Sequence, residues 1–196
     1  MEAERYRQHG VRRVVTGFGD DGKSHFVIDD VAPSIFAFDD EPNFRQDDVW
    51  VTTFPADPGG PDLVARQGPV PLDPPPGGTI FRLAILPPDE RITELFTDPA
   101  FMADLATKYD GGDAHEEDDD FQYHRSDTID YVQVLEGEVV LELDSGEEVT
   151  LQRGDCVVQR GTNHAWRNQS GKPVVVSSVL VSTRPVPGAG SGGGGA

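Results

Sequence analysis

Three residues whose side chains could carry out chemistry lie within 45 residues of one another in the second half of this 196-residue sequence: His124, Asp130 and His164. Imidazoles titrate near neutral pH and a carboxylate can exchange protons with them, so the set can act as a general acid–base system. Two histidines and one carboxylate can also bind a divalent metal. A satisfied polar network without chemistry is the third interpretation. The residue types alone leave all three open.

Strands must position these side chains, because the surrounding sequence is rich in alternating apolar residues and glycine turns. Alternate residues of a strand face the same side. If residues 123–135 form one strand, His124, Ser126 and Asp130 share a face with aliphatic neighbours. That face is then the interior of the domain, where an unpaired charge is costly and the side chains need partners.

Two further residues are expected to line the same interior. Trp166 shares strand parity with His164 and can stack on a substrate or pack in the core. Arg82, in an apolar strand, can bind a substrate carboxylate through two parallel hydrogen bonds. Pairing of Arg82 with an acidic residue of the chain is the alternative. With Ser126, these residues form the predicted substrate-lining set.

The chain as a whole is predicted to be all-β, with one short helix at about 98–109. Asp98 is a suitable N-cap and Pro99 suits the first helical position. Short strands separated by turn residues are typical of a sandwich or barrel. They are predicted at 11–16, 24–28, 50–54, 79–86, 131–135, 139–143, 148–151, 156–159 and 174–181.

The domain organisation follows from composition. Residues 1–78 are interpreted as an N-terminal strand extension with a hairpin and a Pro/Gly-rich loop. Residues 79–183 form the barrel domain, and 184–196 a Gly-rich tail that is predicted to be disordered. The acidic run 116–120 is interpreted as a solvated loop, since consecutive carboxylates point in different directions.

The net charge and the cysteine content limit the kinds of partner that this chain can bind. The formal net charge of -19 disfavours binding to nucleic acid or to an anionic membrane. Cys156 is the one cysteine, so no intrachain disulfide can form. The N-terminus lacks a signal-peptide core and no apolar stretch is long enough to span a bilayer. We expect a cytoplasmic protein whose partner is a small-molecule substrate, with no nucleotide cofactor.

Residues 124–168 resemble the two sequence motifs of the cupin superfamily, a family of small β-barrel proteins. In the first motif, His124 matches the first histidine, Ser126 stands where a second histidine is usual, Asp130 replaces glutamate, and Gly137 matches the glycine. In the second, the matching positions are Gly154, Gly161, His164 and Asn168, with Gln159 where proline is usual. The resemblance implies a jelly-roll-like barrel over about 79–183.

The resemblance also implies a metal site, from which this sequence departs. Serine at 126 removes one of the four usual ligands, and Asp130 is shorter than glutamate by one methylene. A divalent metal (Fe, Zn, Mn or Ni) held by His124, Asp130 and His164 stays possible, because three protein ligands suit a catalytic site. Without a metal, the two histidines are the acid–base candidates.

Three functions are therefore expected, in order. The first is a lyase, similar to dehydratases among small microbial cupins of natural-product tailoring. It would dehydrate or decarboxylate an oxygenated acid or polyketide-like intermediate, with His164 moving the proton and with Asp130 and His124 orienting it. The second is an iron-dependent cupin oxygenase. The third is a cupin that binds a small ligand without turnover. A homodimer is also expected, with the N-terminal strands covering a sheet edge.

Overall fold

The computed structural model describes residues 3–64, 69–110 and 123–184. The elements follow in the order α1 (Ala3–His9), β1 (Arg12–Phe18), β2 (Ser24–Val31), β3 (Ser34–Phe38), β4 (Glu41–Thr52), β5 (Val70–Pro71), β6 (Thr79–Leu86), α2 (Asp89–Thr97), α3 (Pro99–Lys108), β7 (Tyr109–Asp110), β8 (Thr128–Glu136), β9 (Glu138–Leu143), β10 (Glu148–Gln152), β11 (Cys156–Arg160), β12 (His164–Arg167) and β13 (Val174–Ser182).

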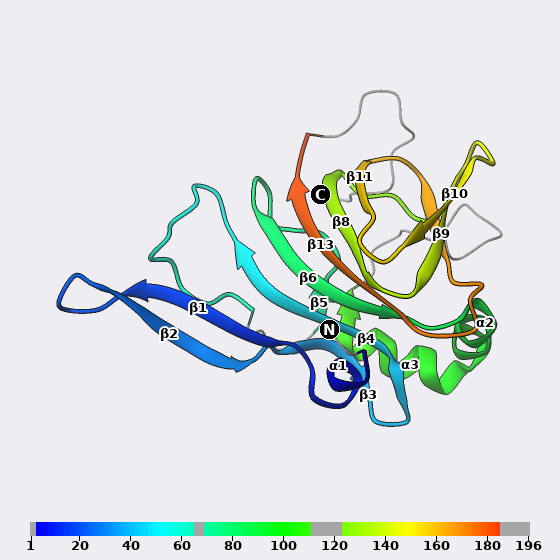
Figure 1. The fold of residues 1–196 in the computed structure, drawn as a ribbon, viewed down its shortest axis with the longest axis horizontal. Helices are drawn as coiled ribbons and strands as arrows, with labels where there is room; N and C mark the ends of the chain where they lie inside the picture. Colours follow the sequence, from blue (N-terminus) through cyan, green and yellow to red (C-terminus); the bar gives the residue numbers. More distant parts are fainter. Residues whose placement is uncertain (1–2, 65–68, 111–122, 185–196) are drawn as a thin grey trace.

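Two antiparallel sheets carry the fold. A six-stranded sheet has the order β11-β8-β13-β6-β4-β3, and a three-stranded sheet has the order β10-β9-β12 (Figure 1). Aliphatic side chains from both sheets form one buried cluster: Val132, Val134, Val139, Leu141, Leu151, Val174 and Val176. Burial of this apolar surface holds the two layers together. The predicted all-β, jelly-roll-like fold is confirmed.

The N-terminal strands extend the larger sheet beyond the strands that were predicted. Strand β4 pairs with β6, and β3 then forms the edge. Only residues 50–54 of this region were predicted as a strand, because Asp47 and Asp48 interrupt its apolar pattern. Both carboxylates are buried, and each is ion-paired, Asp47 with Arg45 and Asp48 with Arg82. A paired charge is tolerated inside a sheet, and single-residue hydropathy does not anticipate the partner.

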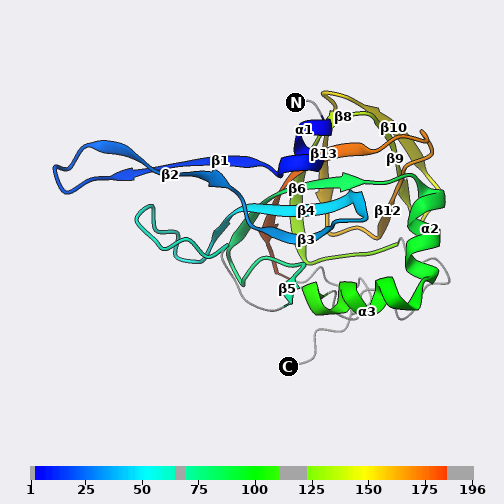
Figure 2. The same ribbon diagram turned by 90° about the horizontal axis from the view of Figure 1, so that it is seen from below.

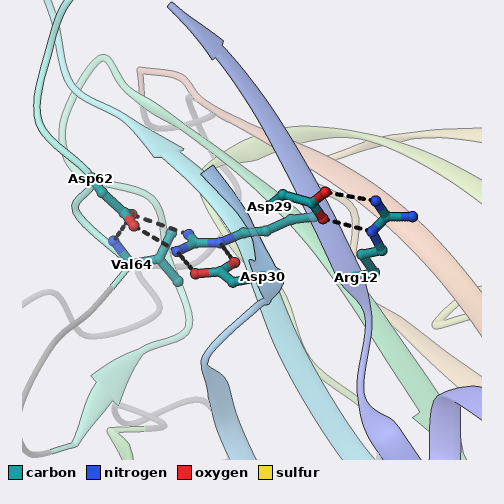
Figure 3. A network of polar contacts seen from close by, with 6 residues as sticks. Arg12, Asp29, Asp30, Asp62 and Val64 are labelled. Atoms are coloured by element: carbon teal, nitrogen blue, oxygen red, sulfur yellow. Dashed lines mark hydrogen bonds and ion pairs between the residues drawn. The ribbon is translucent and has the colours of Figure 1, made fainter. Parts of the chain in front are cut away.

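Strands β1 and β2 form the predicted hairpin, which projects away from the two sheets as an arm (Figure 2). Its base is held by charge pairs. Arg13, almost fully buried, bonds the carboxylates of Asp30 and Asp62, and Asp62 also accepts a hydrogen bond from the backbone of Val64. Figure 3 shows Asp30 and Asp62 facing each other across this contact. The arm is therefore fixed to the loop that follows β4.

Three helices are present among the described residues, so the prediction of one short helix is wrong. Helix α3 begins where predicted, with the Asp98 side chain accepting a hydrogen bond from Ala100 N. Helix α2 begins directly after Pro88. The Pro87-Pro88 pair was interpreted only as the end of strand 79–86, whereas proline is equally compatible with a helix start. Helix α1 packs on the outer face of the larger sheet, where Tyr6 Oη donates to Leu83 O at 3.0 Å.

Some predictions fall on other parts of the chain. The acidic run 116–120 lies outside the described residues, as does the Gly-rich tail beyond residue 184. Within the described residues, no helix combines the length and apolar character needed to cross a membrane.

Candidate functional site

The two candidate histidines are direct neighbours across an antiparallel bridge. His124 N donates to His164 O at 2.9 Å, and His164 N donates to His124 O at 3.1 Å. Residues paired in this way project their side chains to the same face. The two imidazole rings accordingly lie with their centroids 4.4 Å apart at 52°. The bridge also joins the segment entering β8 to the start of β12, and so links the two sheets at this point.

His164 is held as a neutral imidazole. Its Nδ1 lies 2.9 Å from the carbonyl oxygen of Thr162, which can only accept, so Nδ1 carries the proton and Nε2 keeps its lone pair. Burial and, to a smaller extent, the charge of His124 lower the pKa of His164 to about 3, against the opposing hydrogen bond to the Thr162 carbonyl.

Asp130 lies on β8 with its side chain turned inward, as strand parity predicted. It is 9% exposed. Burial raises the pKa of Asp130 to about 6; a hydrogen bond from Thr128 and the charge of Arg82 oppose the rise, and Asp73 adds to it. Its Oδ1 is buried and has no hydrogen-bond partner among the described residues. Asp130 can therefore exchange a proton close to neutral pH, and its Oδ1 can accept a hydrogen bond from a ligand.

His124, His164 and Asp130 all line one cavity of about 430 Å³ between the two sheets and the helices. A volume of this size suits a small organic ligand. Most of the remaining wall is apolar, and helices α2 and α3 contribute part of it. The apolar lining residues are Phe44, Leu72, Ala84, Leu86, Ile92, Phe96, Met102, Leu105, Ala106, Val132, Trp166, Val176 and Leu180.

The predicted substrate-lining residues have different placements. Trp166 lines the cavity, with its ring edge-on to His164 at 5.9 Å between centroids. Arg82 also lines the cavity, but its guanidinium binds Asp48. Ser126 bonds the Thr128 hydroxyl at 2.6 Å and is not part of the described cavity wall. Strand β8 begins only at Thr128, so the parity rule does not reach back to Ser126.

Sequence reasoning missed four further polar residues of the cavity wall: Gln46, Tyr109, Gln159 and Ser178. Gln159 pairs with Asp130 across β11 and β8, is buried, and donates to the Thr162 hydroxyl and carbonyl. Strand alternation could have predicted this, because Gln159 lies two residues after Val157 and so faces the same, inward side of β11. The motif resemblance marks Gln159 only as the residue that replaces the usual proline. Tyr109 lines the other end of the wall, and burial raises its pKa to about 12. Nothing local marks Tyr109, since it follows a helix.

The described residues do not fit the predicted three-residue metal set. The two imidazoles meet, and Nε2 of His164 is available as a ligand atom. However, no group of three or more histidine, cysteine or acidic side chains within 3–64, 69–110 and 123–184 is arranged to hold a metal ion. Asp130 therefore does not complete a metal site with the histidines in this arrangement. Its electrostatic neighbours are Asp73 and Arg82.

The cupin domain family matches residues 113–181. Phomopsin biosynthesis cluster protein C' of Diaporthe leptostromiformis is 64% identical over 47 residues, which cover 24% of this chain and 25% of that protein. The cupin-domain-containing oxidoreductase virC of Hypocrea virens is 41% identical over 66 residues, covering 32% and 34% respectively. The chain thus aligns with only a quarter to a third of these relatives' length.

Among solved structures, the polyketide cyclase RemF from Streptomyces resistomycificus aligns with a TM-score of 0.38 at 14% identity, covering 74% of this chain and 68% of that one. The match to the cupin domain coincides with the strands that carry the histidine pair and Asp130. Two facing antiparallel sheets with a cavity between them are the architecture that the motifs implied. Over residues 113–181, the chain is thus similar to the cupin superfamily.

Proposed function

We propose that this chain is a cupin enzyme of secondary metabolism, a lyase that removes water, or carbon dioxide, from a small molecule held in the cavity. One observation carries the proposal: a mostly apolar cavity of about 430 Å³ whose wall includes an imidazole pair and a buried carboxyl group. An apolar pocket with a few placed polar groups, some with perturbed pKa values, is typical of a catalytic site.

The roles differ between the three groups. Asp130, with a pKa of about 6, is the general acid, because its value lies nearest to neutral pH. His164 stays neutral, so it orients the substrate and holds His124 in place. His124 takes the proton as general base, since burial keeps charge away from His164. The sequence alone had assigned the proton transfer to His164.

In a dehydration, the base would remove a proton from carbon next to a carbonyl group, and the C–O bond to the β-hydroxyl would break. Asp130 would donate its proton to the departing hydroxyl, which leaves as water while the carbon–carbon double bond forms. The proton on His124 then returns through solvent to Asp130. Apolar walls exclude bulk water and so strengthen the electrostatic interactions of these groups.

Relatives in biosynthesis clusters support the assignment to secondary metabolism. Besides the phomopsin protein, Oryzines biosynthesis cluster protein J of Aspergillus oryzae is 54% identical over 48 residues. Their names place those proteins in small-molecule pathways. The aligned segments cover 25% and 27% of the lengths of these two proteins.

The test is reconstitution of the pathway in a heterologous host, with and without this chain, followed by mass spectrometry. We expect a metabolite heavier by one water, or by one carbon dioxide, to accumulate when the chain is absent. Asp130→Asn and His124→Ala should fail to restore the product. Tyr131→Phe, at an exposed neighbour of Asp130, is the matched control and should restore it. A metabolite pair that differs by two hydrogen atoms alone, or by one oxygen atom alone, would contradict the lyase.

An oxidoreductase is the second candidate, because four relatives are named cupin-domain-containing oxidoreductases. An iron-dependent oxygenase would need ligands beyond the two imidazoles. Metal analysis of protein purified without oxygen tests this candidate. Stoichiometric iron, with loss of activity on adding a chelator, would favour it over the lyase.

A cytoplasmic homodimer completes the proposal. The β1–β2 arm exposes Phe18 and Phe26, at 74% and 77%, in a two-stranded sheet that is marginal by itself. A second copy of this chain would cover these side chains and stabilise the arm.

A further inference from the structure

Arg82 is the one arginine or lysine among the described residues of the cavity wall, and it is committed to a partner. Its Nε donates to Asp48 Oδ1 at 2.7 Å, its Nη2 to Asp48 Oδ2 at 3.3 Å, and its Nη1 to Leu72 O at 3.0 Å. Arg82 and Asp48 are 3% and 2% exposed. This two-point contact uses both carboxylate oxygens and neutralises the arginine inside the fold.

A substrate carboxylate therefore has no good partner at Arg82. To bind it, Arg82 would have to release Asp48, and an unpaired buried carboxylate is strongly unfavourable. Asp130 and Asp73 add negative charge near the same guanidinium. The whole chain is also acidic, with a formal net charge of -19. The electrostatics of the cavity thus oppose an anionic ligand.

Asp130, unlike Arg82, has a side-chain atom that can bind a ligand, because it can accept a hydrogen bond from a donor. Its Oδ1 is buried and unpartnered among the described residues, while the residue lines the cavity. A buried acceptor without a donor raises the free energy of the native state, and a ligand hydroxyl that fills it recovers that free energy. The neighbouring walls, from Val132 and Leu180, offer only apolar contact.

We propose that the cavity selects an uncharged, largely apolar molecule whose hydroxyl group donates a hydrogen bond to Asp130, and that it rejects carboxylates. The inference rests on the proposed function in taking this cavity as the substrate site. It narrows that function to dehydration, because decarboxylation of a free acid would require a bound carboxylate. It also replaces the expected oxygenated acid by an uncharged, hydroxylated substrate.

The test is calorimetric binding of four probes with one skeleton: 4-phenyl-1-butanol, 4-phenylbutanoate, 4-phenylbutylamine and butylbenzene. Tryptophan fluorescence in a Trp50→Phe background, which leaves Trp166 in the cavity wall, gives a second readout. We expect the alcohol to bind about tenfold more tightly than each of the others, the difference that one hydrogen bond to a buried and otherwise unsatisfied acceptor can supply.

Two variants at one position test the role of Asp130. Asp130→Val should weaken the alcohol to the affinity of butylbenzene and leave butylbenzene unchanged. Asp130→Asn keeps an acceptor oxygen and removes the charge, so it should retain alcohol binding and improve binding of the carboxylate. Tyr131→Phe, next to Asp130 but exposed, should leave all four affinities unchanged. Thermal unfolding of each variant checks that it is folded.

The proposal is overturned if the carboxylate binds as tightly as the alcohol, if the amine binds most tightly, or if no probe binds. It is also overturned if folded Asp130→Val keeps its preference for the alcohol. These outcomes are independent of turnover. Loss of the pathway product in Asp130→Asn together with equal binding of all probes would retain the lyase and reject this selectivity. If the probes show the expected selectivity but the metabolites do not change, the selectivity would be retained and the lyase rejected.

Discussion

At the scale of single residues, burial sets the chemistry of the site more than composition does. His164 and Asp130 are titratable groups of one cavity, yet burial moves their pKa values in opposite directions, to about 3 and about 6. In both cases the charged form is disfavoured, because the apolar wall replaces water. The result is a neutral imidazole beside a carboxyl group that holds its proton into the neutral range.

Ionisation of Asp130 should therefore lower the free energy of unfolding as pH rises. Its folded pKa of about 6 lies above the unfolded value of 3.8, so stability is fully present below pH 3.8 and is lost as pH rises through 6. Asp130→Asn removes this loss. Relative to the unsubstituted chain, the variant should gain roughly 2–3 kcal/mol in unfolding free energy between pH 4 and pH 8. Urea unfolding across this range measures the gain.

Asp29→Asn is the control for that experiment. Asp29 is exposed, and its hydrogen bonds from Arg12 lower its pKa. Its contribution is therefore present above its unfolded pKa and is lost as pH falls, the opposite sign. A pH-independent difference for Asp130→Asn would contradict a raised pKa at this position.

At the scale of elements, two contacts between strands organise the site. The bridge between His124 and His164 brings the imidazoles together across the two sheets. The ion pair between Arg82 of β6 and Asp48 of β4 fixes the neighbouring wall. In the sheet register these two residues are direct partners, so one side-chain pair both neutralises the charges and supports the alignment of β4 on β6.

Breaking the buried pair should be far more harmful than removing it. Arg82→Met leaves Asp48 buried without its partner and should lower the unfolding free energy by about 3–5 kcal/mol. The double variant Arg82→Met/Asp48→Leu should recover most of that loss, because no charge is left uncompensated. Denaturant titration of the single and double variants measures the coupling. Arg12→Met, at the exposed pair with Asp29, should change little. Equal losses in the single and double variants would contradict this account.

At the scale of the whole molecule, the projecting β1–β2 arm is the part whose exposed apolar side chains a second copy of the chain would cover. The arm projects away from the two sheets (Figure 2). Its base is secured by Arg13, while its outer part exposes Phe18 and Phe26 to solvent. The cavity lies in the body of the fold, lined by both sheets and by helices α2 and α3. The proposed dimer contact and the proposed catalytic cavity thus lie in separate parts of the chain, so they can be tested separately.

Light scattering after size exclusion should give the mass of two chains. Phe18→Ser/Phe26→Ser should give the mass of one, because it removes the apolar surface that the second copy would cover. Probe binding in the cavity should persist in this variant. Lys23→Ser, in the turn of the same arm, is the matched control and should remain dimeric. A monomer in the unsubstituted chain would disprove the homodimer.

The sequence by itself determined the features that depend on residues a few positions apart. Strand alternation placed Asp130 and the aliphatic residues of β8 inside, and the Asp98-Pro99 pair marked the start of α3. Where alternation stops, at the bend before Thr128, the prediction for Ser126 lost its basis. Three-dimensional structure decided the rest: the pairing of His124 with His164, the helix after Pro88, and the partner of Arg82, which lies 34 residues away. Local periodicity and turn chemistry act between near neighbours in sequence, whereas sheet order and register decide which distant side chains meet, and so which buried charges are satisfied and which atom is left for a ligand.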